Sequence, residues 1–346
     1  MRIQSLDGLR GIAIFLVVTF HVYAHWESAI AWASHSEFAL FKYGSFGVEL
    51  FFLISGFVIH MTLENTQNFK TFLIKRWLRL FPGMLLGTTV IYASSFYMPE
   101  RPMGDIHWPD LLSGWLFIDA QIVNQLQTER VFKNVEASFW SLFVEIKFYI
   151  LFGFFYFMNK KTALRHLIGV FLLAFIFKWL AFSSSKLTAY AYFCLFDVLS
   201  LQYLGALCVG ACLYEFYFKN DKFWGACSLL LMAPTLLIVF TQTDELIVGF
   251  MVYLFFVLTL FNQHVADFAK NRCWVFLGFI SYPLYLIHEN ALIALAIKTH
   301  HYFPSLPGDL TPVPGELMVL LVSYWIAKYG EPTLKRTLQP LLLSKP

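Results

Sequence analysis

Long apolar runs recur from one end of the chain to the other, and only short polar gaps separate them. Each run approaches the roughly 20 residues that an α-helix needs to cross the hydrocarbon core of a bilayer. The pattern predicts an all-α, polytopic membrane protein in which residues 1–346 form a single domain. We expect about ten membrane-spanning helices, at residues 8–25, 46–63, 82–98, 137–157, 164–182, 193–214, 222–240, 246–262, 274–297 and 313–329.

The composition excludes several other classes of protein. With 58% apolar residues, 39 phenylalanines and only 14% charged residues, the chain has more hydrophobic surface than one soluble core could bury. Its net charge of +3 is spread thinly, which argues against a nucleic-acid partner. The five cysteines are an odd number and lie mostly inside apolar runs, which argues against a disulfide framework. We therefore expect lipid as the solvent of this chain.

Lysines and arginines indicate the orientation, because cytoplasmic connections retain positive charge. Arg2 precedes the first span, and these residues are frequent at the C-terminus and in every second connection, the first of which contains Lys70, Lys75, Arg76 and Arg79. The alternate connections are poorer in these residues, and the longest of them covers about 99–136. We therefore expect the N-terminus and the C-terminus on the cytoplasmic side.

The first predicted helix carries two side chains that a purely structural membrane helix would lack. Arg10 and His21 are eleven residues apart, close to three helical turns, so they project from one face about 16 Å apart along the axis. An ionisable residue at the centre of a span costs at least about 2.5 kcal/mol on insertion scales, so such residues usually face a cavity or a partner. Both residues are therefore candidates for a functional site.

Further polar residues are predicted at the level of His21, in the outer half of the membrane. This outer layer contains Glu49 on the second helix, Trp140, Ser141 and Glu145 on the fourth, and Tyr285, His288 and Glu289 on the ninth. Five histidine and glutamate side chains from four helices would share it. Glu145 is equally open to a structural role, as the partner of Arg10 or of a histidine. His21 and His25 lack a third ligand, so we expect no metal site there.

Lys75, Arg76 and Arg79 are predicted on the opposite, cytoplasmic side, at the entrance to the third helix. Arg76 and Arg79 are three residues apart and can present one basic surface to an anion. The positive-inside rule is an alternative reason for the same three residues. An anion-binding entrance inside and an acid–base layer further out are the two features that the polar pattern predicts.

Six stretches resemble the membrane-bound acyltransferase-3 family, whose members modify bacterial surface glycans and related acceptors. They are Ser5-Leu6-Asp7-Gly8-Leu9-Arg10-Gly11 with His21, Gly47 through Phe57, Arg76 through Pro82, Trp140-Ser141-Leu142 with Glu145, Phe148 and Tyr149, Ile280 through His288, and Glu331-Pro332. The resemblance extends over nearly the whole chain in the family's order, and it is to the stand-alone form without an appended extracellular domain. One departure is Glu49, where the family commonly has aspartate.

The resemblance implies a multi-pass enzyme of the bacterial inner membrane. It would move an acyl group, by default acetyl, from cytoplasmic acyl-CoA to a hydroxyl of an extracytoplasmic acceptor, by default a carbohydrate. The family's arginine and histidine of helix one fall on Arg10 and His21, and its two-arginine loop falls on Arg76 and Arg79. These arginines, with Lys75, would bind the donor, since guanidinium groups suit phosphate oxygens. Acyl-CoA would be a substrate, and we expect no permanently bound cofactor or metal.

His21 is the candidate general base on the acceptor hydroxyl, because imidazole accepts a proton near neutral pH. Glu49 or Glu145 would orient it and stabilise the imidazolium. A covalent acyl-histidine intermediate is a second route that the sequence leaves open. The residues expected to line the cavity are Trp140, Ser141, Tyr285 and His288.

A different class of function fits the same polar residues. Intramembrane histidines and glutamates also relay protons in transporters. A proton-coupled transporter or exporter of a small acylated or anionic solute is therefore the alternative to an acyltransferase. We see no repeated halves and no pair of broken helices in the sequence, which favours the enzyme.

Overall fold

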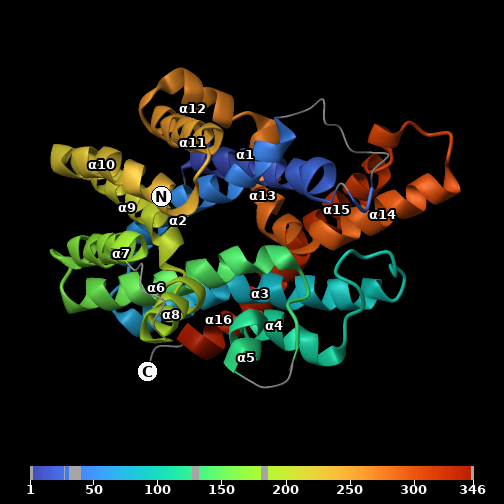
Figure 1. The fold of residues 1–346 in the computed structure, drawn as a ribbon, viewed down its shortest axis with the longest axis horizontal. Helices are drawn as coiled ribbons and strands as arrows, with labels where there is room; N and C mark the ends of the chain where they lie inside the picture. Colours follow the sequence, from blue (N-terminus) through green and yellow to red (C-terminus); the bar gives the residue numbers. More distant parts are fainter. Residues whose placement is uncertain (1–2, 27, 31–39, 127–131, 181–185, 344–346) are drawn as a thin grey trace. The chain divides into compact units, whose positions relative to one another are not determined.

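The computed structural model describes residues 3–26, 28–30, 40–126, 132–180 and 186–343, which form helices and loops without a strand (Figure 1). The chain divides into two compact units. Unit 1 contains the described residues of Met1–Gly47, Trp77–Ser141 and Ala269–Pro346, and unit 2 contains those of Val48–Arg76 and Leu142–Phe268.

Unit 1 is built around the two ends of the chain and the long connection in its middle. Its helical segments are α1 (Gln4–Phe20), the π-helix His21–His25, the 3-10 helix Phe41–Phe46, α3 (Phe69–Ser95) from Trp77 onward, the 3-10 helix Trp108–Asp110, α4 (Leu111–Trp115), α5 (Ala120–Leu126), the 3-10 helix Ala137–Phe139, α13 (Arg272–Ile287), α14 (Glu289–Tyr302), the 3-10 helix Gly308–Leu310, α15 (Val313–Trp325), the π-helix Ile326–Gly330 and α16 (Glu331–Leu343). The helices α14 and α15 lie side by side (Figure 1).

Unit 2 contains most of the central part of the chain. Its helical segments are α2 (Gly47–Glu64), the start of α3, α6 (Trp140–Met158) from Leu142 onward, α7 (Ala163–Leu180), α8 (Lys186–Tyr192), the π-helix Phe193–Val198, the 3-10 helix Leu201–Tyr203, α9 (Leu204–Lys219), α10 (Lys222–Val239), α11 (Thr243–Phe261) and α12 (Gln263–Ala269). The sequence caps α10 at Asp221, whose side chain accepts a hydrogen bond of 3.0 Å from the Phe223 amide.

The predicted all-α, multi-pass class is confirmed, with a different number of spans. Within the described part of the chain, eight helical segments are long and apolar enough to cross a membrane, and the bent pair α13–α14 would be a ninth. The predicted span 193–214 is interrupted at Ser200, whose φ is 55°, and the apolar segment long enough to cross begins at Leu201. The predicted span 164–182 runs past Leu180 onto residues that lie outside the described part.

The third helix begins thirteen residues earlier than the predicted 82. α3 starts at Phe69, behind Asn68, whose side-chain oxygen accepts a hydrogen bond of 2.9 Å from the Thr71 amide. Lysines and arginines lower the hydropathy of its first turns, which is why the apolar pattern misses them. Arg76 and Arg79 therefore lie on a helix and not in a loop.

Close packing of α1 on α13 brings the first helix against the ninth predicted span. A Cβ atom built on Gly11 would lie 1.9 Å from a backbone oxygen of α13, and one built on Gly278 would lie 1.8 Å from a backbone oxygen of α1. Small residues allow membrane helices to approach this closely. His21 follows Gly11 by ten residues and His288 follows Gly278 by ten, about 15 Å in each helix, so the two histidines reach the same level.

The span predicted as one helix over 274–297 is bent by 80° between α13 and α14. His288 is the hinge residue, following Ile287 and preceding Glu289. Non-helical backbone at membrane depth is tolerated where it is buried in protein or lines a cavity. The exposed fraction of His288 is 0%, which meets that condition.

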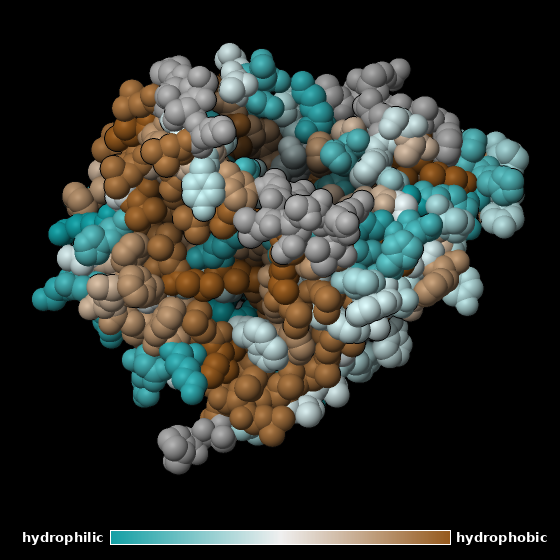
Figure 2. Space-filling view, turned by 60° about the horizontal axis from the view of Figure 1, so that its bottom comes forward, coloured by the Kyte–Doolittle hydropathy of each residue, from teal (hydrophilic) through white to brown (hydrophobic). Residues whose placement is uncertain are grey.

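Hydrophobic side chains dominate much of the molecular surface (Figure 2). Large apolar residues with exposed fractions above one half occur on α7, α10, α11 and α15, among them Leu173, Leu230, Met251 and Leu321. A soluble protein rarely exposes apolar side chains on this scale. The surface is therefore suited to lipid contact.

Candidate active site

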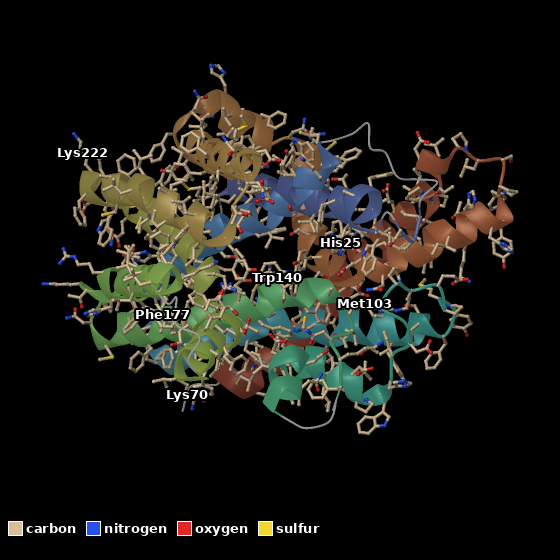
Figure 3. The ribbon with its side chains drawn as sticks, in the orientation of Figure 1. His25, Lys70, Met103, Trp140, Phe177 and Lys222 are labelled. Atoms are coloured by element: carbon tan, nitrogen blue, oxygen red, sulfur yellow. The ribbon has the colours of Figure 1, made fainter. Side chains whose placement is uncertain are left out.

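His21 opens a short π-helix that continues α1 to His25. Single π-turns inside α-helices are frequent at functional sites. The side chain of His21 is 13% exposed, and its Nδ1 lies 2.9 Å from the carbonyl oxygen of Val17. His25, labelled in Figure 3, closes this segment, which packs on α14. The Val17 carbonyl and the packing on α14 thus fix the position of His21 in unit 1.

His288 meets His21 at the bend between α13 and α14. Its Nε2 lies 3.1 Å from Nδ1 of His21, and its own Nδ1 lies 2.9 Å from the carbonyl oxygen of Tyr285. The two imidazole rings are edge to face, with centroids 4.8 Å apart. The sequence predicts the two histidines at the same depth, and in the structure they are in direct contact.

The partners of the two rings determine where the protons lie. A carbonyl oxygen only accepts, so Nδ1 of His288 donates to Tyr285, and its Nε2 carries a lone pair. Nδ1 of His21 donates in turn, and its hydrogen is shared between Val17 and the lone pair of His288. Nε2 of His21 is therefore left with a lone pair, which is the form a general base requires.

Glu289 is the carboxylate beside this lone pair. Its Oε1 lies 3.8 Å from Nε2 of His21, and its Oε2 accepts a hydrogen bond of 2.8 Å from the backbone amide of Ser138. The side chain of Glu289 is 1% exposed. A carboxylate fixed in this way can stabilise an imidazolium formed at His21.

Tyr285 and Ser141 connect the histidine pair to the start of α6. Ser141 Oγ lies 2.7 Å from the Tyr285 hydroxyl, which donates a hydrogen bond of 2.9 Å to the carbonyl oxygen of Ser138. Trp140 is the first residue of α6 and is partly buried (Figure 3). The structure therefore brings Ser141 and Tyr285 together, and their role in lining a cavity stays a prediction.

A buried ion pair ties the long predicted external connection to this site. Arg101 lies 3.2 Å from Glu136, and the side chains of both are almost completely buried. Glu136 also accepts hydrogen bonds from the backbone and side-chain nitrogens of Asn290, the residue after Glu289. Burial raises the pKa of Glu136, while the Arg101 guanidinium and the Asn290 donors oppose that rise. Glu136 of the long connection thus fixes Asn290, two residues after His288 at the bend.

Arg79 lines a separate cavity of about 310 Å³ in unit 1. Its guanidinium carbon lies 5.3 Å from the ring centroid of Tyr282, whose hydroxyl donates a hydrogen bond of 2.7 Å to the carbonyl oxygen of Leu80. Glu331 and Lys335 of α16 share the cavity. Two cations and one carboxylate therefore surround a space that could receive an anionic group.

Arg76 and Glu145 are placed differently from the expectation. The polar pattern predicts them on opposite sides of the membrane, but in unit 2 Arg76 lies 3.9 Å from Glu145 and donates a hydrogen bond of 2.7 Å to the Tyr149 hydroxyl. Glu145 also accepts a hydrogen bond of 2.8 Å from Ser55. The extension of α3 back to Phe69 brings Arg76 within reach of α6, so Glu145 has a structural partner that the sequence did not indicate.

The remaining predicted residues have simpler surroundings. Arg10 donates a hydrogen bond of 3.1 Å to Asp7, one turn earlier on α1. Lys75 is exposed on α3. Glu49 belongs to the first turn of α2 in unit 2 and interacts electrostatically with Tyr203. Glu289, predicted in the outer layer but not as a catalytic residue, is the carboxylate that contacts His21, and its position next to His288 was the available signal.

Comparisons with known proteins show what the chain is similar to. The family model of the acyltransferase-3 domain, described as an acyltransferase domain, matches residues 3–328. A peptidoglycan O-acetyltransferase, OatA of Listeria monocytogenes, is 30% identical over 50% of this chain and 28% of its own length. A putative O-acetyltransferase of Staphylococcus aureus strain COL is 27% identical over 87% of this chain and 52% of its own length. The acyltransferase MdmB of Streptomyces mycarofaciens is 26% identical over 48% of this chain and 42% of its own length.

The matches differ in how much of this chain and of each relative they cover. The chain spans about half the length, or less, of these curated relatives. No solved structure matches it significantly. The family model, however, covers residues 3–328 of the 346 and includes every predicted site residue. The chain therefore belongs to the acyltransferase-3 family.

Proposed function

We propose that this protein is an integral membrane O-acyltransferase that moves an acyl group, by default acetyl, from cytoplasmic acyl-CoA to a hydroxyl of an extracytoplasmic carbohydrate. Family membership and the printed names of the relatives support acyl transfer to oxygen. The lysine and arginine distribution supports a cytoplasmic donor side, and a bacterial inner membrane is the matching location. The histidine pair carries the proposal.

The decisive observation is that Nδ1 of His21 lies within hydrogen-bond distance of Val17 and His288, which leaves Nε2 as the nitrogen with a lone pair, 3.8 Å from the carboxylate of Glu289. Nε2 takes the proton of the acceptor hydroxyl as its oxygen attacks the thioester carbonyl carbon. A carbon–oxygen bond forms, and the carbon–sulfur bond of the thioester then breaks. The departing CoA sulfur recovers the proton from the imidazolium, so the products are the ester and free CoA.

Glu289 and His288 support this base in different ways. Glu289 offers a negative charge to the imidazolium, which exists only while the proton is on His21. His288 accepts the hydrogen on Nδ1 of His21 and so fixes the tautomer. An acyl-histidine route uses the same Nε2 as nucleophile, and detection of acyl transfer to the protein itself would distinguish it.

The donor would meet the cavity around Arg79. A guanidinium and the ammonium of Lys335 suit the phosphates of CoA. Exposed Lys75 is available for the same purpose. Arg76 and Arg10 already have carboxylate partners, so we assign them a supporting role and expect the phosphates to depend chiefly on Arg79.

Acetyl-CoA labelled in the acetyl group tests the proposal. Purified protein in bilayers should release free CoA when it is given a hydroxyl acceptor such as a short glycan. His21→Gln should abolish release, while His166→Gln, an exposed histidine on α7, should not change it. Movement of label into sealed vesicles without thioester cleavage would instead identify a transporter. Wild-type turnover by His21→Gln would remove His21 as the base.

The acceptor is best sought in cells. Surface polysaccharide from cells with the gene should carry ester-linked acyl groups that are absent from a deletion strain. Restoration by the wild-type gene, and not by a His21→Gln allele, would link the ester to this site. An unchanged polysaccharide would redirect the search to lipids, small molecules or peptidoglycan.

A further inference from the structure

A second polar cluster lies in unit 2, at the ends of α2 and α9. His60 and Glu64 are near the end of α2, and Glu215 is near the end of α9. They share a cavity of about 390 Å³. α9 packs beside α10, whose first residue Lys222 is labelled in Figure 3. The orientation predicted from the sequence places this end of both helices at the cytoplasmic surface.

His60 is held in a fixed orientation. It is 3% exposed, and its Nδ1 lies 3.2 Å from the carbonyl oxygen of Ala211. Nδ1 must therefore carry a hydrogen, and Nε2 is directed at Glu215, 3.0 Å from Oε1. A backbone carbonyl behind a histidine in this way is the usual support of a metal-binding imidazole, because it fixes the tautomer and raises the basicity of the other nitrogen.

Two carboxylates complete a set of three possible ligands. Glu64 follows His60 by four residues, so the two side chains lie on one face of α2. Tyr214 donates a hydrogen bond of 2.7 Å to Oε2 of Glu64, which leaves Oε1 directed at the cluster. One ligand atom from each of the three residues lies within 4.8 Å of the others. Ligands of a tetrahedral zinc are roughly 3.4 Å apart, so rotation of the glutamates would close the site.

A lysine now occupies the place of the cation. The ammonium of Lys219 forms ion pairs with Oε1 of Glu64 and, at 2.8 Å, with Oε1 of Glu215. Its side chain is 46% exposed, so it can move outward at little cost. The single positive charge of the ammonium offsets only part of the charge of the two carboxylates. One divalent ion would offset both.

We propose that His60, Glu64 and Glu215 form a site for one divalent transition-metal ion, which binds in competition with the ammonium of Lys219. One imidazole nitrogen and two carboxylate oxygens are ligands that Zn²⁺ accepts, and the adjoining cavity leaves room for water in a fourth position. Bound metal would join the end of α2 to the end of α9. The proposal is independent of the acyl-transfer mechanism.

Zn²⁺ competition against a chromophoric chelator, with purified full-length protein in detergent, tests the site. His60→Gln and Glu215→Gln should weaken the tightest Zn²⁺ binding by about 100-fold or more, since loss of even an outer partner costs 10- to 100-fold. Lys219→Met should tighten it by roughly tenfold, because the displaced ion pairs are half exposed. Exposed His166 is the matched control, and His166→Gln should leave the affinity unchanged.

The Lys219→Met variant distinguishes loss of the site from misfolding, because a misfolded protein would not bind Zn²⁺ more tightly. Equal Zn²⁺ affinity in wild type and His60→Gln would overturn the proposal, as would an unchanged affinity in Lys219→Met. Either result would show that the cluster is only a network of ion pairs. Thermal unfolding provides a second readout, in which Zn²⁺ should raise the midpoint of wild type and Lys219→Met but not of Glu215→Gln.

Discussion

Replacing Glu289 with glutamine would remove the negative charge beside His21 and leave the shape of the site nearly unchanged. The glutamine oxygen can still accept the hydrogen bond from the Ser138 amide, so the start of α6 keeps its contact with the bend. Only the electrostatic support of the imidazolium is lost. The substitution therefore separates charge stabilisation from the positioning of His21.

The size of this effect follows from the distance between the two groups. A full positive charge on Nε2 of His21 and a full negative charge on Oε1 of Glu289 are 3.8 Å apart. At an effective dielectric constant of about 20 their attraction is about 4 kcal/mol. The substitution therefore costs about 2 kcal/mol of transition-state stabilisation if half of the proton charge has developed on the imidazole, and about 4 kcal/mol if all of it has. The turnover number should then fall by roughly 30- to 1,000-fold.

Release of free CoA from acetyl-CoA, measured at saturating donor and acceptor, is the assay. Glu289→Gln should lower kcat and leave KM for acetyl-CoA unchanged, because the charge acts on the proton-transfer step. The thermal midpoint should stay within a few degrees of wild type. A kcat within threefold of wild type would show that Glu289 does not stabilise the imidazolium.

Three further predictions concern the support of the site. His288→Gln can still accept the hydrogen on His21 and should retain activity within about tenfold, while His288→Leu should lose about 100-fold in kcat. Gly11→Val forces α1 away from α13 and should lower the free energy of unfolding in detergent by about 3 kcal/mol. Gly169→Ala is the control: an added Cβ there meets nothing within 4 Å, so this variant should not be destabilised. Arg79→Ala should raise KM for acetyl-CoA about tenfold or more with kcat unchanged.

Each of these has a result that contradicts it. Equal activity of the glutamine and leucine variants at 288 would mean that the hydrogen bond between the histidines is unimportant. A wild-type melt for Gly11→Val would mean that α1 and α13 do not pack as closely as described. A fall in kcat at unchanged KM for Arg79→Ala would move that arginine from donor binding to chemistry.

Much of the fold could be predicted because lipid imposes a simple pattern. Apolar runs locate most spans, and counting helix directions places His21 at the level of His288 and Glu289. The pattern fails where charge lies inside a helix. Lys75, Arg76 and Arg79 lower the hydropathy at the start of α3, so the helix is predicted to begin too late.

The site itself was only partly predictable. The apolar run over 274–297 gives no sign of the bend at His288, because a bend depends on partners from elsewhere. One such partner is Glu136, which accepts hydrogen bonds from Asn290 of the run itself, and no local pattern indicates that these two residues meet. Glu145 was misplaced for the same reason, since its contact with Arg76 depends on how α3 and α6 pack. The depth of a residue in the membrane can be counted along the sequence, but the sequence pattern does not show which helices pack side by side.

The contact between His21 and His288 has a consequence for synthesis of the chain. The two residues are 267 positions apart, so at 5 to 20 residues per second the ribosome needs roughly 13 to 53 s to supply the second histidine after the first. During that interval α1 is inserted with a polar ring whose described partner within its own helix is the Val17 carbonyl. Nascent chains halted before residue 288 should therefore depend on an insertase or another helix to shelter α1, and catalytic competence can appear only near the end of translation.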